Sequence, residues 1–300
     1  MFMKTVLGEI RADELGVTLP HEHICCYSEY ALMMMGKRYL DKEALMEASV
    51  AYLREMKEKH SLSTIFDCTP VNIGRDIELL KRVSEESEIN IVSSTGFYYT
   101  DEPVLYTATA EELADYISTD AKATNAAIIK CAVEREEITP FLEKVLRACA
   151  MAHRECGLPI VMHSNARNRN AKAALEILFS EDVKPSAITV GHLSDTEDIE
   201  YVKEIAAHGC FIGLDRLRAD TSEEYVSKKL FTINELIRSG YGEQILLSHD
   251  SLFFSGFDKQ PKINEKPRLA YLFEEILPRL PEDIGRLLTV DNPARAIQAK

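Results

Sequence analysis

Eight short apolar runs, of the kind that forms buried strands, alternate along this 300-residue chain with amphipathic, helix-like stretches. The runs end at intervals of 22 to 48 residues, near Pro20, Cys68, Thr95, Cys131, His163, His192, Leu214 and Asp250. Because no hairpin motif joins neighbouring runs, the alternating β and α units predict a parallel sheet covered by helices. Two folds satisfy this pattern: a closed (β/α)8 barrel and an open, doubly wound sheet.

The polar residues at the ends of the runs favour the closed barrel. Candidate ligands end the first, fourth, fifth, sixth and eighth runs, and only a barrel brings these strand ends together. The first run also lacks the Gly-x-Gly-x-x-Gly motif that follows the first strand of a dinucleotide-binding sheet. The sequence therefore predicts an α/β fold, a (β/α)8 TIM barrel, with residues 1–300 forming one domain. We expect residues 1–16 to be a short N-terminal lead-in, a hairpin that caps the barrel bottom.

Composition limits the class of partner. A net charge of −14 disfavours nucleic acid or an anionic membrane as the main partner. The seven cysteines are odd in number and include no Cys-x-x-Cys pair, so we expect reduced thiols in a cytoplasmic protein. The N-terminal apolar stretch is too short for a signal peptide, and no window approaches a membrane span. A small-molecule partner fits these limits best.

The segment LPHEH at residues 19–23 places two histidines two residues apart. In an extended strand, residues i and i+2 point to the same face, so His21 and His23 can bind one cation together. On its own, such a pair is more often incidental than a metal site. Four further candidates end later apolar runs, and these are Lys130, His163, His192 and Asp250. This array is what a metallohydrolase built on a β/α barrel would show.

The chain resembles the phosphotriesterase-like group of the amidohydrolase superfamily. The resemblance extends over nearly the whole chain and rests on GVTLPHEH, the Lys130 strand, GLPIVMHS, TVGHLSDTEDIEYVKEIAAHGCFIGLD, LLSHD and DNPARA. Members of this group are (β/α)8 barrels that hold two divalent metal ions. The resemblance implies that Lys130 bridges the two ions as an N6-carboxylated lysine, a carbamate. The other implied ligands are His21, His23 and Asp250 for the buried ion and His163 and His192 for the more exposed ion.

Lysine at the bridging position has a chemical consequence of its own. An ammonium group cannot ligate a metal and would repel two cations, so Lys130 fits this position only as an anionic, oxygen-bearing group. Some relatives have glutamate there, whereas this chain keeps lysine. The alternative is an ordinary snorkelling or salt-bridged lysine. Zinc suits a site of mixed nitrogen and oxygen ligands, and manganese, cobalt and iron would accept the same ligands.

The resemblance also implies a mechanism. A hydroxide that bridges the two ions would be the nucleophile, because the ions lower the pKa of its parent water toward neutrality. Asp250 would take up the proton of the hydroxide and deliver it to the leaving group.

Two positions favour lactone substrates. Tyr98 falls where lactonase relatives carry a tyrosine beside the metals, whereas phosphotriesterases have a tryptophan, which this chain lacks. Arg216 matches an arginine of lactonase relatives at the end of the seventh strand. With Asp250, we expect both to be catalytic residues. Each also has a structural interpretation: Tyr98 could line the barrel mouth, and Arg216 could pair with Asp215 or Asp220.

The segment after the eighth strand is basic in an otherwise acidic chain. It carries Lys259, Lys262, Lys266 and Arg268, and loops in this part of a barrel are frequent phosphate sites. We therefore expect these four residues to bind the substrate together with the two positions above. A solvated charged loop is the alternative.

The sequence thus predicts a metal-dependent hydrolase of ester bonds, with lactonase activity on a small, phosphorylated or carboxylated sugar lactone as the first expectation. The enzyme alternatives are hydrolysis of organophosphate triesters and of acyl-homoserine lactones. The loop after the eighth strand is shorter than the one that helps to form the hydrophobic channel of acyl-homoserine lactonases, which counts against that substrate. A barrel that binds metal without catalysis is the alternative from another class. Related proteins are commonly dimers, so the resemblance allows a homodimer.

Overall fold

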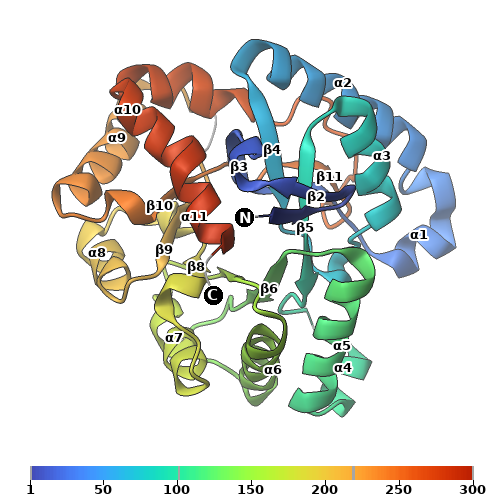
Figure 1. The fold of residues 1–300 in the computed structure, drawn as a ribbon. Coiled ribbons are helices and arrows are strands. Elements are labelled where there is room, and N and C mark those ends of the chain that lie inside the picture. The colour runs from blue at the N-terminus through green and yellow to red at the C-terminus, as the bar shows by residue number, and fades with distance from the viewer. Residues whose placement is uncertain (1, 101, 218–219, 299–300) are drawn as a thin grey trace.

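Each apolar run forms a strand that pairs in parallel with its neighbours in the sequence (Figure 1). The computed structural model describes residues 2–100, 102–217 and 220–298. The strands lie in the order β10-β9-β8-β7-β6-β5-β4-β3-β11. Their bounds are β3 Val17–Cys26, β4 Leu62–Asp67, β5 Asn90–Gly96, β6 Ile128–Ala132, β7 Ile160–His163, β8 Ile188–Val190, β9 Phe211–Leu214, β10 Ile245–Leu247 and β11 Leu252–Ser255.

Two short pieces of chain share the last strand position of the barrel. β10 pairs with β9, whereas β11 pairs with β3, so these consecutive strands join the two edges of the sheet. Between them, the backbone N–H of Asp250 donates to the carbonyl of His21 at 3.1 Å, and that of His23 donates to the carbonyl of Ser251 at 2.9 Å. The sheet therefore closes around eight strand positions, which confirms the predicted (β/α)8 TIM barrel and excludes an open sheet.

The first barrel strand is longer than its apolar run. We expected the run to end near Pro20, but β3 continues to Cys26 and contains both histidines of the LPHEH segment. Pairing with β11 extends the strand, since Leu252 lies opposite His23 in the register of this pair. The pairing of β3 with β4 shifts register next to Pro20, where a residue without an N–H interrupts the ladder.

Helices connect the strands and form a ring around the barrel (Figure 1). The main hydrophobic core lies between this ring and the strands, and it includes Leu53, Leu146 and Leu236. None of the described helices has the length and apolar character that a bilayer-spanning helix requires. The helix bounds are α1 Glu29–Met35, α2 Lys42–His60, α3 Ile77–Ser87, α4 Pro103–Thr107, α5 Ala110–Thr124, α6 Pro140–Cys156, α7 Ala171–Ser180, α8 Ile199–Ala207, α9 Glu223–Arg238, α10 Glu282–Arg286 and α11 Asn292–Gln298.

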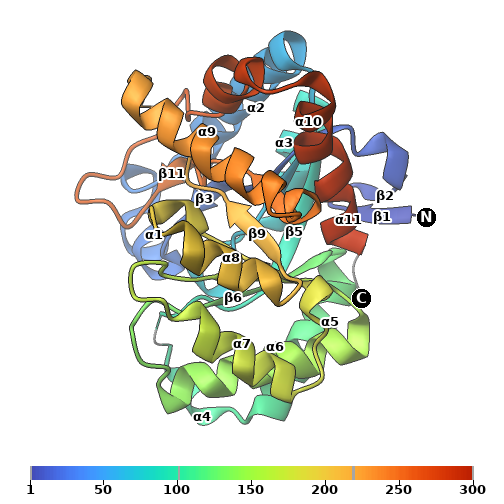
Figure 2. The ribbon, with the colours of Figure 1, turned by 90° about the vertical axis from the view of Figure 1, so that its left-hand side faces the viewer.

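The N-terminal lead-in forms an antiparallel hairpin of β1 (Phe2–Thr5) and β2 (Gly8–Arg11). Met3 from this hairpin and Ile297 from α11 pack in one cluster with barrel residues such as Val92. Figure 2 shows the hairpin and α11 together at one end of the barrel. They therefore close the end where the strands begin, as expected, and the polar strand ends face the opposite side.

Candidate metal centre and active site

A cavity of about 400 Å³ lies at the C-terminal ends of the strands. Every one of the predicted metal-binding residues except His21 lines it, and His21 lies directly behind, with its ring 5.6 Å from that of His23. Tyr98 and Arg216 line the same cavity. The barrel thus brings together the predicted metal ligands from five strand ends, although His21 and Asp250 lie 229 positions apart in the sequence.

The two histidines of β3 point toward Asp250. The Nε2 atom of His23 lies 3.0 Å from Oδ1 of Asp250, and Nε2 of His21 lies 3.6 Å from the same oxygen. These three side chains can each offer one ligand atom within 4.8 Å of the others. Asp250 reaches them because it lies in the break between β10 and β11, with a positive φ of 52°.

His163 at the end of β7 and His192 just after β8 form a second pair. The Nδ1 atom of His163 lies 2.8 Å from Nε2 of His192, so these two nitrogens face one another. Burial and the charge of His192 lower the pKa of His163 to about 3. Burial and the charge of Lys130 likewise lower the pKa of His21 to about 3. Both rings are therefore neutral at pH 7, which is the protonation state that a metal ligand needs.

Lys130 lies between the two groups of histidines and is only 1% exposed. Its Nζ atom is 2.8 Å from Nε2 of His21. Within the described ranges, no carboxylate forms an ion pair with this ammonium, so the salt-bridged alternative lacks a partner. A buried ammonium beside imidazoles is costly. An anionic carbamate that shares two cations with these histidines would remove that cost, so the donor set fits two metal ions.

The backbone next to Lys130 is packed tightly against β5. Gly96 lies opposite Lys130 in the β5–β6 register, and Phe97 N–H donates to the carbonyl of Lys130 at 2.9 Å. Gly96 has a φ of +92°, and a Cβ atom at this position would lie 2.1 Å from the carbonyl oxygen of Lys130. A glycine is therefore required where the two strands approach each other.

Asp215 orients two of the histidines. One of its oxygens lies 2.6 Å from Nδ1 of His21, and the other lies 3.0 Å from Nδ1 of His192. Burial would raise the pKa of Asp215, but its interactions with His192 and His21 hold this pKa well below its ordinary value. This carboxylate therefore fixes the rings so that Nε2 of each faces the centre, as carboxylates behind metal-binding histidines commonly do.

The other two histidines have their own partners. Thr69 Oγ1 lies 2.8 Å from Nδ1 of His23, and Glu134 Oε2 lies 2.8 Å from Nε2 of His163. All four imidazoles thus have one nitrogen held by a neighbour and the other directed at the centre. Sequence reasoning did not identify these orienting residues. Their positions in the sequence could have indicated them, because Glu134 follows the Lys130 strand and Asp215 directly precedes Arg216, at the same strand ends as the predicted site.

Glu22, the residue between the two histidines, organises the break in the last barrel strand. Its Oε1 atom accepts hydrogen bonds from the Ser248 hydroxyl at 2.8 Å and from the backbone N–H of His249 at 3.0 Å. Its Oε2 atom accepts from the backbone N–H of Ser251 at 2.8 Å. The ring of His249 also binds Glu22, at 2.8 Å, and it does not line the cavity. Glu22 therefore holds the segment that carries Asp250.

Arg216 is engaged by two carboxylates. Its Nε donates to Oδ2 of Asp250 at 2.8 Å, and a terminal nitrogen donates to Oδ2 of Asp195 at 2.7 Å. These partners differ from Asp215 and Asp220, which the sequence offered as alternatives. Arg216, just after β9, thus links Asp250 to Asp195, which follows β8. These two hydrogen bonds fix the orientation of the Asp250 carboxylate.

Tyr98 stands over the second pair of histidines. Its ring packs edge-on against the ring of His163, with the centroids 5.3 Å apart. Asn72 holds the Tyr98 backbone by accepting its N–H at 2.7 Å. Burial, with the neighbouring Tyr99 hydroxyl, raises the pKa of Tyr98 well above its ordinary value. The phenol therefore stays protonated and can donate a hydrogen bond in the cavity.

The four cations expected to bind substrate lie elsewhere. Lys259, Lys262, Lys266 and Arg268 are exposed, and the cavity is not lined by any of them. The chain turns back along β11 here, as the backbone N–H of Asn264 donates to the carbonyl of Phe253 at 2.7 Å. This turn directs the segment outward, where Lys266 pairs with Glu55 of α2 at 3.2 Å. The structure thus places these four side chains outside the cavity, and their role in substrate binding stays a prediction.

Comparison with known proteins places the chain in one family. Residues 1–295 match the model of the phosphotriesterase family. An aryldialkylphosphatase of Saccharolobus solfataricus is 33% identical over 304 residues, covering 95% of this chain and 96% of that protein. A phosphotriesterase homology protein of Mycobacterium tuberculosis is 29% identical over 320 residues, covering 99% and 97%. The N-acetyltaurine hydrolase of Homo sapiens is 26% identical over 291 residues, covering 83% of each chain. The chain therefore belongs to the phosphotriesterase family and is a metal-dependent hydrolase.

Proposed function

We propose that this protein is a binuclear, metal-dependent lactonase that opens a small lactone carrying a phosphate or carboxylate, with residues 1–300 as its hydrolase domain. The observation that carries the proposal is the cavity in which three of the four histidines, with Lys130 and Asp250, meet Tyr98 and Arg216, while His21 lies directly behind it. By resemblance, these last two residues distinguish lactonases from phosphotriesterases. A lactone fits a cavity of about 400 Å³ because its reacting ester is a compact ring.

The six donors divide into two sites with one shared residue. Lys130, as a carbamate, would be the shared ligand, and the inward-facing nitrogens of the four histidines and the carboxylate of Asp250 would supply the rest. Bound divalent ions would lower the pKa of water toward neutrality and polarise the scissile carbonyl. Zinc is the first expectation for this mixture of nitrogen and oxygen donors, and manganese, cobalt or iron would also fit. The assigned ligands are His21, His23 and Asp250 for one ion and His163 and His192 for the other.

The residues around the donors have separate roles in the reaction. Asp250 accepts the proton of the attacking water and delivers it to the alkoxide that leaves as the ring opens. Arg216 holds the carboxylate of Asp250 in place through the hydrogen bond of 2.8 Å. The protonated phenol of Tyr98 donates a hydrogen bond to the substrate, and its ring helps to exclude water from the histidines behind it.

An anionic substituent on the substrate is supported by a relative whose named substrate, N-acetyltaurine, is a small molecule with a sulfonate group. A second candidate function, hydrolysis of phosphotriesters, is favoured by the similarity to the aryldialkylphosphatase. The two candidates share the same donors, so they differ in the group that the cavity must accommodate and in the charge of the substrate.

A kinetic screen tests the proposal. The metal-loaded protein is assayed with γ- and δ-lactones of sugars, with and without phosphate, and with an aryl dialkyl phosphate and an acyl-homoserine lactone. We expect the highest kcat/KM for a small anionic lactone. Faster turnover of the aryl dialkyl phosphate than of every lactone would replace the lactonase with a phosphotriesterase. Bound metal without turnover of any of these esters would favour the non-catalytic barrel.

A further inference from the structure

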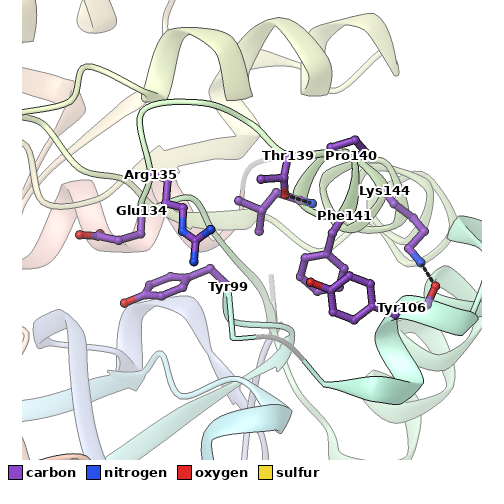
Figure 3. Close-up of a pocket in the computed structure, with 9 residues that line it drawn as sticks. Tyr99, Tyr106, Glu134, Arg135, Thr139, Pro140, Phe141 and Lys144 are labelled. Carbon is purple, nitrogen blue, oxygen red and sulfur yellow. Dashed lines mark hydrogen bonds between the residues drawn. The ribbon is translucent and has the colours of Figure 1, made fainter.

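A second cavity, of about 460 Å³, adjoins the candidate active site (Figure 3). It is formed by the segment after β5, the segment after β6 and the first turn of α6. One wall is aromatic, because the rings of Tyr106 and Phe141 are stacked with their centroids 4.6 Å apart. The residues that line the cavity include Tyr99, Tyr106, Glu134, Arg135, Phe141 and Lys144.

The two cavities share a wall. Tyr99 lines both of them, and its ring lies 5.7 Å from the ring of His163. Glu134 lines the second cavity and binds His163 at 2.8 Å. A substrate whose ester group lies against His163 can therefore extend over Tyr99 into the second cavity.

Arg135 supplies the available positive charge in this cavity. Figure 3 shows its guanidinium above Tyr99, directed into the cavity. Among residues 2–100, 102–217 and 220–298, none forms a hydrogen bond or ion pair with this guanidinium. The other cation, Lys144, already donates to the carbonyls of Tyr106 and Ala108, both at 2.8 Å.

The charges nearby leave Arg135 able to bind a ligand. The adjacent carboxylate of Glu134 is bound on both oxygens, by His163 and by the side-chain amide of Asn165 at 2.9 Å. Arg216, the arginine of the first cavity, is likewise committed to Asp250 and Asp195. An anion that enters from the active site thus meets an arginine whose side-chain N–H donors are not used by the described part of the chain.

Resting on the proposed lactonase function, we infer that the second cavity is the subsite for the anionic substituent of the substrate and that Arg135 determines this specificity. The planar guanidinium can donate two parallel hydrogen bonds to a carboxylate or phosphate. The aromatic walls pack against the carbon atoms that link the anion to the lactone ring. The shared position beside Tyr99 and Glu134 keeps this linker short, so the substrate is small.

The test compares a charged and a neutral substrate of the same shape. The probes are a γ-lactone that bears a carboxylate and the same lactone with a primary carboxamide, assayed with the metal-loaded enzyme. We expect Arg135→Ala to lower kcat/KM for the carboxylate about tenfold, mainly through KM, because a charge-assisted hydrogen bond of an exposed group is lost. The carboxamide should change less than about twofold. Arg135→Lys should retain most of the preference for the anion, because the charge remains.

Arg286→Ala is the matched control, because this arginine of α10 is 69% exposed and lies outside both cavities. It should leave both substrates unaffected. Equal losses for the charged and neutral lactone in Arg135→Ala, or no loss for either, would overturn the inference. If the wild-type enzyme opens no lactone, the lactonase proposal fails by itself. An aryl hemisuccinate and the corresponding aryl succinamate then provide the same charged and neutral comparison for Arg135.

Discussion

Burial of the Lys130 ammonium is electrostatically unfavourable when no metal is bound. Its ammonium is 1% exposed, lies 2.8 Å from an imidazole nitrogen, and has no carboxylate partner among the described residues. Removing an ion of this size from water costs on the order of several kcal/mol when no partner compensates for it. Conversion to a carbamate would change the sign of the charge and would thereby turn this cost into metal affinity.

We therefore expect Lys130→Met to abolish stable binding of the metal pair, whereas the wild type contains about two divalent ions per chain. The metal-free variant should be at least as stable as the metal-free wild type, because methionine fills a similar volume without a buried charge. Elemental analysis and urea unfolding measure the two effects. Lys122→Ala, at an exposed lysine of α5, is the control and should bind metal normally. Full metal content in Lys130→Met would rule out the bridging role.

Asp250 combines two contacts that a neutral side chain cannot reproduce, one with His23 at 3.0 Å and one with Arg216 at 2.8 Å. Asp250→Asn should reduce kcat by a factor on the order of 10² to 10⁴, because an amide cannot accept the proton of the attacking water. Metal content should fall much less, since the amide oxygen remains a possible ligand. A loss of turnover smaller than about tenfold would remove the proton-transfer role from Asp250.

Some of these residue roles could be predicted from the sequence and some could not. The six donors end apolar runs, so their meeting follows from the fold once the barrel is assumed. The roles of Asp215, Thr69 and Glu134 depend on which ring nitrogen each one faces, which only the folded backbone decides. The exposed position of the four cations after β11 could not be predicted, because composition does not reveal that the segment folds back along β11.

At the scale of elements, the approach of β5 to β6 positions Lys130. Gly96→Ala should destabilise the protein by about 3 kcal/mol or more and lower its metal content, because the new Cβ would overlap the carbonyl of Lys130. Gly240→Ala is the matched control, since Gly240 has a similar φ of +86° and a Cβ atom there would meet no other atom within 4 Å. It should cost only about 1–2 kcal/mol of backbone strain and leave metal content unchanged. Equal effects in chemical unfolding and elemental analysis would contradict the role of Gly96.

The strands themselves were predictable because buried parallel strands are continuous apolar runs. The continuation of β3 through its histidines and the break between β10 and β11 were not. Both depend on hydrogen bonds between residues that are far apart in the chain, such as His21 N–H to Ser248 Oγ across 227 positions. Local sequence patterns carry no information on such pairings.

For the whole molecule, the buried neutral histidines predict how stability depends on pH. Burial with Lys130 lowers the pKa of His21 to about 3, and burial with His192 does the same for His163. Between about pH 6.5 and pH 3, each of these residues binds a proton in the unfolded chain but not in the native protein. Stability of the metal-free protein should therefore fall as pH falls through this range, by up to about 1.4 kcal/mol per pH unit for each histidine.

His23 does not reverse this trend. Burial by itself would lower the pKa of His23, but Cys26 and Asp250 raise it to about 10. His23 is therefore protonated in both the native and the unfolded state below about pH 6.5. Urea unfolding of the metal-stripped protein at about pH 7, 6 and 5 measures the slope. A free energy of unfolding that is constant or rises toward the acid end of this series would show that these histidines are not buried and neutral in the native state.

The barrel closes where β10 and β11 meet β3, and this affects when the metal site can form during translation. His21 and His23 leave the ribosome early, whereas Asp250 and the segment that Glu22 holds follow more than 220 residues later. During most of translation, the early histidines stand in a chain whose barrel cannot close. The complete donor set, and with it a metal centre that retains its ions, therefore forms only after the last strand position has been made and has joined the first.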